Sequence, residues 1–160
     1  MPESSRRKLW RLCREVHAAD AFSGEGARLF GGRWNSRGVP MVYASSSLAL
    51  ATIELFVHLE PHQMPRDLVS IEAFLPEDEQ VESWEGKLLP PNWWSDEFGP
   101  MRAQGDSWIR SRQSLAVLVP SVPIRQEWNL LLNPRHPRMS EVTVHAVQPF
   151  VFDDRMFHIR

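Results

Sequence analysis

The most apolar stretch of the chain runs from Gly38 to Leu59, but one proline, three serines, Thr52, Glu54 and His58 interrupt it too often for a membrane span. Met41–Ala44 has the length and composition of a short buried strand. After it, apolar residues recur every three or four positions and also fill the opposite side, which predicts a helix buried on most sides. Ser45–Ser47 provide candidate N-caps, and Pro61 helps to stop the helix after about Leu59.

Shorter patterns predict the remaining elements. Strands are expected at Leu68–Leu75, Leu115–Val119 (stopped by Pro120), the apolar centre of Glu127–Pro137, and Val142–Val147. Leu9–His17 is a strand or a short helix, Trp108–Arg112 is a helix end, and Asp20–Gly38 and Pro76–Pro100 are irregular. Strands dominate, so we expect an α+β fold with mixed, mainly antiparallel sheets and a few helices. The lack of a linker or repeat predicts a single domain over residues 1–160.

Composition narrows the classes of function. The formal net charge is −2 and 24% of residues are charged, so we expect no direct binding of nucleic acid. The single cysteine, Cys13, excludes an internal disulfide framework and a multi-cysteine zinc site. The histidines show no paired ligand spacing, since Pro61 separates His58 from His62, and we expect no metal. The segment Met1–Leu12 lacks the pattern of a secretory signal, which favours a cytoplasmic location.

A glycine-rich loop between Gly24 and Gly38 contains three arginines: Arg28, Arg33 and Arg37. Guanidinium groups bind phosphates in a bidentate way, and glycines let the backbone approach a ligand closely, so the loop suits a diphosphate. Its spacing matches neither a Walker loop nor the dinucleotide fingerprint. Composition alone favours a surface loop whose arginines are solvated or paired with carboxylates.

Glu54 is the only formal charge between Arg37 and Glu60, and it lies on the apolar helix. A carboxylate kept from water is paired, protonated or used in chemistry. A pair with a loop arginine such as Arg33, or a helix turn that reaches solvent, explains it equally well. Tyr43, the only tyrosine, ends the preceding strand and either borders the same cleft or packs in the core.

Two downstream positions are further candidates. Ser121 follows a buried strand, where a hydroxyl either faces a cleft or hydrogen-bonds a turn, and the surrounding sequence lacks the glycines of a hydrolase elbow. Asn129 and His136 are candidate ligand contacts, although the turn-forming Asn-Pro and His-Pro steps explain most of this segment.

Several ordered motifs closely resemble the RES-domain family, over nearly the whole chain from about Trp10 to about Pro137. They are Phe22–Gly24, Gly31–Asn35, Val42–Ala51 with Glu54 and His58–Leu59, Val119–Ser121, and Asn129–Pro137. The family name records an arginine, a glutamate and a serine, and the resemblance carries these onto Arg33, Glu54 and Ser121 as the catalytic residues.

The resemblance implies a fold like that of ADP-ribosyltransferases of the diphtheria-toxin type, and a toxin of a bacterial toxin–antitoxin pair. Its substrate would be NAD+, cleaved at the nicotinamide–ribose bond with inorganic phosphate as the probable co-substrate or with water. The alternative is ADP-ribosylation of a host protein. Arg28, Arg33, Tyr43 and Asn129 would bind NAD+, with Tyr43 packed on the nicotinamide ring.

The same resemblance implies a cognate antitoxin with a helix-turn-helix part that blocks the NAD+ cleft. The assembly would be a homo-oligomer of this chain or a toxin–antitoxin hetero-oligomer. An alternative function, from a class other than enzymes, is a non-catalytic module. It would bind a partner protein through three exposed tryptophans, Trp84, Trp93 and Trp94.

Overall fold

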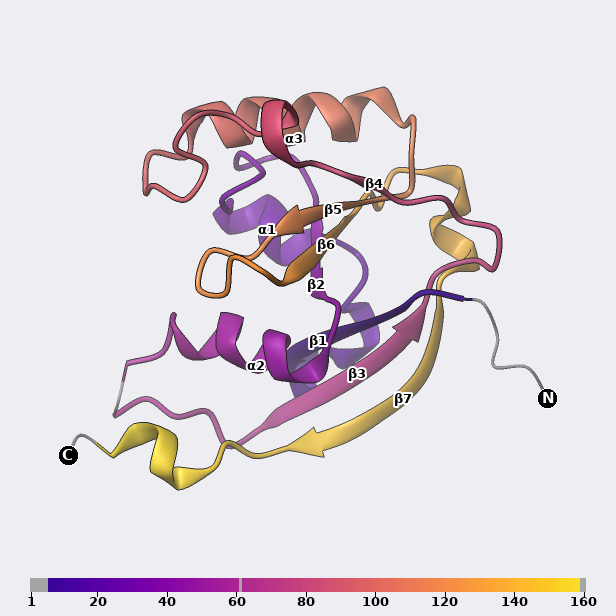
Figure 1. Cartoon of the computed structure of the whole chain (residues 1–160). Helices are drawn as coiled ribbons and strands as arrows, with labels where there is room; N and C mark the ends of the chain where they lie inside the picture. Colours follow the sequence, from indigo (N-terminus) through magenta and orange to yellow (C-terminus); the bar gives the residue numbers. More distant parts are fainter. Residues whose placement is uncertain (1–5, 61, 159–160) are drawn as a thin grey trace.

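A seven-stranded sheet forms the centre of the computed structural model, which describes residues 6–60 and 62–158 (Figure 1). The strand order is β4-β5-β6-β2-β1-β3-β7. The strands are β1 (Lys8–Arg14), β2 (Val42–Ser45), β3 (Leu68–Phe74), β4 (Glu82–Ser83), β5 (Ala116–Pro120), β6 (Trp128–Leu132) and β7 (Thr143–Phe150). Neighbouring strands are antiparallel except for β4 and β5, which are parallel, so the predicted α+β class with mainly antiparallel pairing is confirmed.

Three α-helices within the described residues cover this sheet: α1 (Glu25–Phe30), α2 (Leu48–Phe56) and α3 (Gly99–Ser111). Short 3-10 helices lie at η1 (Glu15–Asp20), η2 (Gly86–Leu88), η3 (Pro137–Glu141) and η4 (Asp154–Phe157). Figure 1 shows α3 crossing the sheet beside β5, whereas α2 lies near β1. None of these helices is long and apolar enough to cross a membrane.

Alternation along β5 and β6 divides the core between the two faces of the sheet. Val117, Val119 and Leu131 lie on one face and pack with Met101 and Ile109 of α3. The residues between them contribute to a second core on the opposite face. All five residues of β5 are buried, as the continuous apolar run predicted for a strand covered on both faces.

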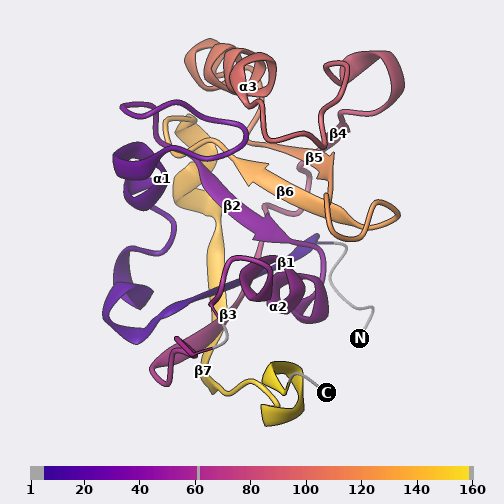
Figure 2. The same cartoon turned by 90° about the vertical axis from the view of Figure 1, so that its left-hand side faces the viewer.

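The sheet opens between β1 and β2. β1 pairs with β3 along its whole length, but with β2 only at Trp10 and Ser45. Next to that pair, Arg11 Nη1 donates a hydrogen bond to the carbonyl of Tyr43, at 2.6 Å. The helix α2 packs against both strands, and Figure 2 shows it beside the opening. Polar residues of β1 and β2, among them Arg11 and Ser45, therefore lie near α2 at this opening.

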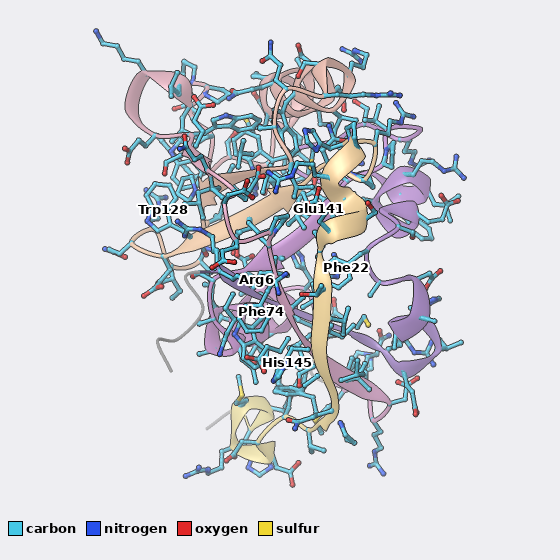
Figure 3. The ribbon with its side chains drawn as sticks, turned by 90° about the vertical axis from the view of Figure 1, so that its right-hand side faces the viewer. Arg6, Phe22, Phe74, Trp128, Glu141 and His145 are labelled. Carbon is cyan, nitrogen blue, oxygen red and sulfur yellow. The ribbon has the colours of Figure 1, made fainter. Side chains whose placement is uncertain are left out.

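Toward the far edge of the sheet, a cation and two rings pack together. In Figure 3, Arg6 and Phe74 lie close together, with His145 of β7 nearby. The guanidinium of Arg6 is 5.8 Å from the ring centroid of Phe74, and the ring of His145 meets that of Phe74 edge-on at 5.7 Å. The strands β1 and β3 separate β7 from β2, so this group is apart from the opening.

The structure corrects one loop prediction and one helix prediction. The predicted loop Asp20–Gly38 contains α1, whose ends are set by glycines in the left-handed half of φ space, Gly24 (φ 74°) and Gly31 (φ 71°). Glycine permits these turns because it has no Cβ. The predicted helix end at Trp108–Arg112 is the last part of the thirteen-residue α3. The start of α3 was not predicted, because prolines in this segment indicated irregular structure. Proline nevertheless fits the first turn of a helix, where its missing N–H needs no partner.

The prediction for α2 was partly wrong. Ser47 is the N-cap, since its side chain accepts a hydrogen bond from the backbone N–H of Leu50, but the helix ends at Phe56. Only Leu50 and Ala51 are buried, and Val57, just past the end, is 52% exposed. One side of the apolar surface borders a cleft instead of core. The predicted stop at Pro61 lies outside the described residues.

Candidate functional site

A cleft of about 850 Å³ lies at the opening between β1 and β2. This volume is in the range of small-molecule binding sites. The walls come from β1, the loop around α1, the face of α2, and the segment between β5 and β6, and most lining residues are apolar. Its central polar residues are Arg11, Arg33, Tyr43, Ser45, Glu54 and Asn129. The described residues contain no cluster of three or more metal-ligating side chains.

Glu54 lies on the cleft face of α2, with Ala51 one turn before it and His58 after it. Its Oε1 accepts a hydrogen bond from Asn129 Nδ2 at 2.5 Å. Glu54 also interacts electrostatically with Arg33, although the two form no ion pair within 4.0 Å. The lone carboxylate of the sequence is therefore a fixed negative group on the wall of a mostly apolar cleft.

Asn129 is itself oriented by Ser45. The two residues are register partners on β6 and β2, and Ser45 Oγ donates a hydrogen bond to Asn129 Oδ1 at 2.7 Å. With its oxygen held by this hydroxyl, the amide presents its NH2 group to Glu54. Ser45 was predicted only as a candidate N-cap. Its position at a strand end was visible in the sequence, but the pairing with Asn129 depends on strand register.

Tyr43 braces the loop that carries Arg33. Its hydroxyl donates a hydrogen bond to Asn35 Oδ1 at 2.7 Å and accepts one from the backbone N–H of Trp34 at 3.0 Å. A Cβ on Gly32 would lie 2.6 Å from this hydroxyl, so glycine is needed for the close approach. Burial raises the pKa of Tyr43 above its ordinary value of 10.0. The ring still lines the cleft.

Asn35 is a site residue that the sequence analysis missed. It is fully buried, and its Nδ2 donates hydrogen bonds to the carbonyls of Ala27 and Val39, at 2.8 and 2.9 Å. The side-chain amide of Asn35 thus links both ends of the glycine-rich loop between Gly24 and Gly38, called the arginine loop below. Its oxygen accepts the hydrogen bond from Tyr43. The residue lies in the Gly31–Asn35 motif, which was the only signal for it.

The Tyr43 hydroxyl gives a directly measurable prediction. Because this is the only tyrosine, absorbance at the tyrosinate band reports on it alone. Burial stabilises the neutral phenol, so we expect no ionisation at pH 10 in the folded protein. The stabilisation is complete below the unfolded pKa of about 10 and is lost as pH rises above it. The burial of this hydroxyl would be contradicted if the tyrosinate absorbance reached half of its full amplitude near pH 10 while circular dichroism showed that the protein was still folded.

Arg33 and Arg28, the two predicted phosphate-binding arginines, have different surroundings. Arg33 lines the cleft, donates from Nη1 to the carbonyls of Trp93 and Ser95, and lies 4.7 Å from the ring centroid of Phe98. Burial lowers its pKa, against the attraction of Asp96 and Glu54. Arg28 is paired with Glu25 through two hydrogen bonds at the surface and does not line the cleft. The geometry therefore favours only Arg33 as a ligand contact.

Ser121 is fully buried and is not part of the cleft wall, although its neighbours Pro120 and Val122 are. Its Oγ accepts a hydrogen bond from the backbone N–H of Ile124 at 3.2 Å, and its own N–H donates to the carbonyl of Glu127. The hydroxyl therefore stabilises the turn between β5 and β6. A direct contact of Ser121 with ligand stays a prediction without support from this geometry.

The predicted set of three exposed tryptophans is wrong. Trp84 is only 6% exposed and packs between Trp34 and Trp108, with ring centroids 5.4 and 5.9 Å away. Trp93 is half-buried against the same core. Trp94 alone of the three is exposed, at 42%. The aromatic residues of this segment mainly build the core beneath α3, so the reading of a tryptophan docking surface loses its basis.

Comparison with known sequences identifies the family. A profile of the RES domain matches residues 8–153. The chain belongs to the RES-domain family. A protein of Sphingobium sp. (strain YBL2) named Prs ADP-ribosylating toxin is 38% identical over 154 residues, covering 92% of this chain and 95% of its own length. A Toxin Res of Yersinia enterocolitica is 34% identical, covering 92% of this chain and 98% of its own.

A solved structure shares the fold of this RES domain. It is the crystal structure of the Mycobacterium tuberculosis MbcT–MbcA toxin–antitoxin complex, with a TM-score of 0.70 and 18% sequence identity. The match covers 95% of this chain and 87% of the other. At that identity the likeness concerns the fold alone, and it agrees with the α+β architecture described above.

Proposed function

We propose that this RES-domain protein is a toxin that cleaves NAD+ at its nicotinamide–ribose bond, with phosphate or water as acceptor. The observation that carries the proposal is the carboxylate of Glu54, which Asn129 holds on the wall of a cleft of about 850 Å³ that Arg33 also lines. The name of the Sphingobium relative, an ADP-ribosylating toxin, supports an enzyme that uses NAD+, and the Yersinia relative is also named a toxin.

The chemistry needs little from the protein beyond electrostatic stabilisation and positioning. The C–N bond between ribose and nicotinamide breaks, its electron pair leaves with the neutral nicotinamide, and a positive charge develops on the ribose. A carboxylate facing that charge stabilises the transition state. A phosphate or water oxygen then forms the new bond to the same carbon, giving ADP-ribose 1″-phosphate, or ADP-ribose and a proton.

Each cleft residue has a role in this scheme. Glu54 faces the ribose, and Arg33, which lines the same cleft, holds the phosphate nearest to that ribose. The ring of Tyr43 packs on nicotinamide, while its hydroxyl keeps the Arg33 loop in place. Ser121 acts on the site through the turn it stabilises, and Arg28 has no part in the cleft.

Product analysis tests the proposal. Purified protein, prepared by cell-free synthesis, is incubated with NAD+ with and without inorganic phosphate. If phosphate is the acceptor, free nicotinamide and ADP-ribose 1″-phosphate are expected only when phosphate is present. If water is the acceptor, free nicotinamide and ADP-ribose are expected under both conditions. NAD+ that stays intact after long incubation would overturn the proposal.

Transfer of ADP-ribose to a protein is the second candidate. The exposed apolar side chains of Leu29, Phe30 and Val57 all line the cleft and offer a surface for a protein acceptor. The relative from Sphingobium is named for ADP-ribosylation. Label from NAD+ that appears on a macromolecule, and not in free ADP-ribose, would favour this candidate.

The proposal includes a cognate antitoxin with a helix-turn-helix part, acting in the cytoplasm. The solved structure with the same fold is a toxin in a toxin–antitoxin complex. We expect expression of this chain alone to arrest growth. Co-expression of a small helix-turn-helix protein from a neighbouring gene is expected to restore growth and intracellular NAD+.

The orienting hydrogen bond from Ser45 gives a prediction about rate. Ser45→Ala frees the Asn129 amide to turn its oxygen toward Glu54, so we expect NAD+ cleavage to slow by about two- to tenfold, mainly in kcat. In an Asn129→Ala background the same substitution is expected to have almost no further effect, because the amide is gone. The exposed neighbour Ser46→Ala is the control. Additive losses in the double variant would contradict this coupling.

A further inference from the structure

Four phenylalanines pack together at the C-terminal end of α2: Phe56, Phe150, Phe152 and Phe157. Phe56 belongs to α2, and its ring centroid lies 5.3 Å from that of Phe157 in η4 and 6.3 Å from that of Phe152. Phe152, which is 3% exposed, meets Phe150 and Phe157 edge-on at 5.3 and 5.4 Å. Figure 2 shows η4 below α2. This phenylalanine cluster therefore joins the end of α2 to η4 and to the end of β7.

The half of α2 that carries Glu54 has little other support. The two buried residues of α2 lie in its first half, and none of residues 52–56 is buried. Glu54 lines the cleft from this second half, whereas Phe56, two positions farther on, does not line it. A helix of nine residues is marginal in water without tertiary packing. The ring contacts of Phe56 therefore hold the turn that carries Glu54 from outside the cleft.

The position of this turn matters for the carboxylate of Glu54. The hydrogen bond from Asn129 fixes the carboxylate at its far end, but only while the backbone that carries the side chain stays in place. Misplacement of a reacting group by about 1 Å costs up to about a hundredfold in rate. The backbone of α2 and the amide of Asn129 thus have to be held together for the charge to face the ribose.

The 3-10 helix η4, which carries Phe157, is fixed by its own residues. The carboxylate of Asp153 caps it, since Oδ1 accepts a hydrogen bond from the backbone N–H of Arg155 at 2.9 Å. The same carboxylate accepts two hydrogen bonds from the guanidinium of Arg155, at 2.9 and 2.8 Å. Such an exposed pair adds little to overall stability, but it closes the turn that presents Phe157 to α2.

We propose that Phe157 is a positioning residue for the cleavage of NAD+: its ring packs on Phe56 and holds the turn of α2 that carries Glu54. The assignment rests on the proposed function. Phe157 does not line the cleft, so it acts through α2 and not on the ligand. It also lies beyond the residues that the RES-domain profile matches, which end at 153. The role therefore belongs to a segment outside the shared family pattern.

The test uses Phe157→Ala, with Met156→Ala, at a half-buried position of the same 3-10 helix, as the control. In Phe157→Ala, kcat for NAD+ cleavage is expected to fall by about five- to twentyfold, because Glu54 is no longer held opposite the ribose. Titration calorimetry with ADP, which cannot be cleaved at a nicotinamide bond, is expected to show unchanged affinity. Phe157→Tyr keeps the ring at a half-buried position and is expected to restore the wild-type kcat.

A double-mutant cycle separates positioning from a general loss of stability. In a Glu54→Gln background, Phe157→Ala is expected to have almost no further effect on kcat, because the charge that it positions is gone. Equal fold losses in the two backgrounds would overturn the proposal. So would a wild-type kcat in Phe157→Ala, or a loss of ADP affinity as large as the loss in kcat. If Phe157→Ala does not fold, Phe157→Leu, which keeps apolar volume, decides by the same criteria.

Hydrogen–deuterium exchange separates this inference from the proposed function, since it needs no substrate. In Phe157→Ala, the backbone amides of residues 52–58 are expected to exchange faster than in the wild type, whereas those of the buried strand β5 are not. Faster exchange, with a wild type that leaves NAD+ intact, keeps the support of α2 by Phe157 and rejects the cleavage. Unchanged exchange, with a wild type that cleaves NAD+, keeps the cleavage and rejects the role of Phe157.

Discussion

Glu54→Gln is expected to reduce NAD+ cleavage by about a hundredfold or more while the protein remains folded. The substitution keeps the size of the side chain and an oxygen that can accept the hydrogen bond from Asn129 Nδ2. What it removes is the negative charge that faces the ribose in the proposed mechanism, where it would stabilise the transition state much more than the ground state. The loss should therefore appear in kcat and leave the affinity for ADP nearly unchanged.

Nicotinamide release under saturating NAD+ gives kcat, and calorimetry with ADP reports binding to the same cleft. Glu60→Gln removes an exposed carboxylate that does not line the cleft, and serves as the matched control. A second variant, Glu54→Asp, keeps the charge but withdraws it from Asn129, and an intermediate rate is expected. If Glu54→Gln cleaves NAD+ at the wild-type rate, Glu54 has no catalytic role.

Local patterns in the sequence predicted most strands. The apolar run that became β5 is buried throughout, and the three leucines that end β6 are buried too, as their composition predicts. The single register pair between β1 and β2 could not be predicted, because register depends on how distant segments twist and pack. That one feature produces the cleft, so the position of the site was not visible from any single segment.

The sequence singled out Glu54 because a lone charge on an apolar helix requires an explanation, and the structure places it on the cleft wall. It did not identify Ser45, Asn35 or Phe157, whose importance depends on partners far along the chain. Ser45 acts through Asn129, 84 positions away, and Phe157 packs on Phe56 of α2. Propensity and spacing describe neighbours within a few residues, so they cannot detect such pairs.

The helix α3 fixes the arginine loop from behind through three contacts. Arg102 Nε donates a hydrogen bond to the carbonyl of Gly32 at 2.8 Å, and Asp106 Oδ1 accepts one from the backbone N–H of Ser36 at 2.9 Å. Between these two residues, Gly105 lies directly against the backbone of Trp34. The segment on both sides of Arg33 therefore takes its position from one turn of α3.

Gly105→Ala is expected to destabilise the protein by about 3 kcal/mol or more, although alanine is the better helix former by about 1 kcal/mol. The new Cβ would lie 1.7 Å from the carbonyl oxygen of Trp34, and a backbone oxygen cannot rotate away as a side chain can. Either α3 or the arginine loop must move, so NAD+ cleavage should fall as well. Urea unfolding followed by tryptophan fluorescence measures the loss. Gly99→Ala, in the same helix with nothing within 4 Å of its Cβ, is the control and should change stability little. Equal unfolding midpoints for the two variants would contradict the close packing of α3 on the loop.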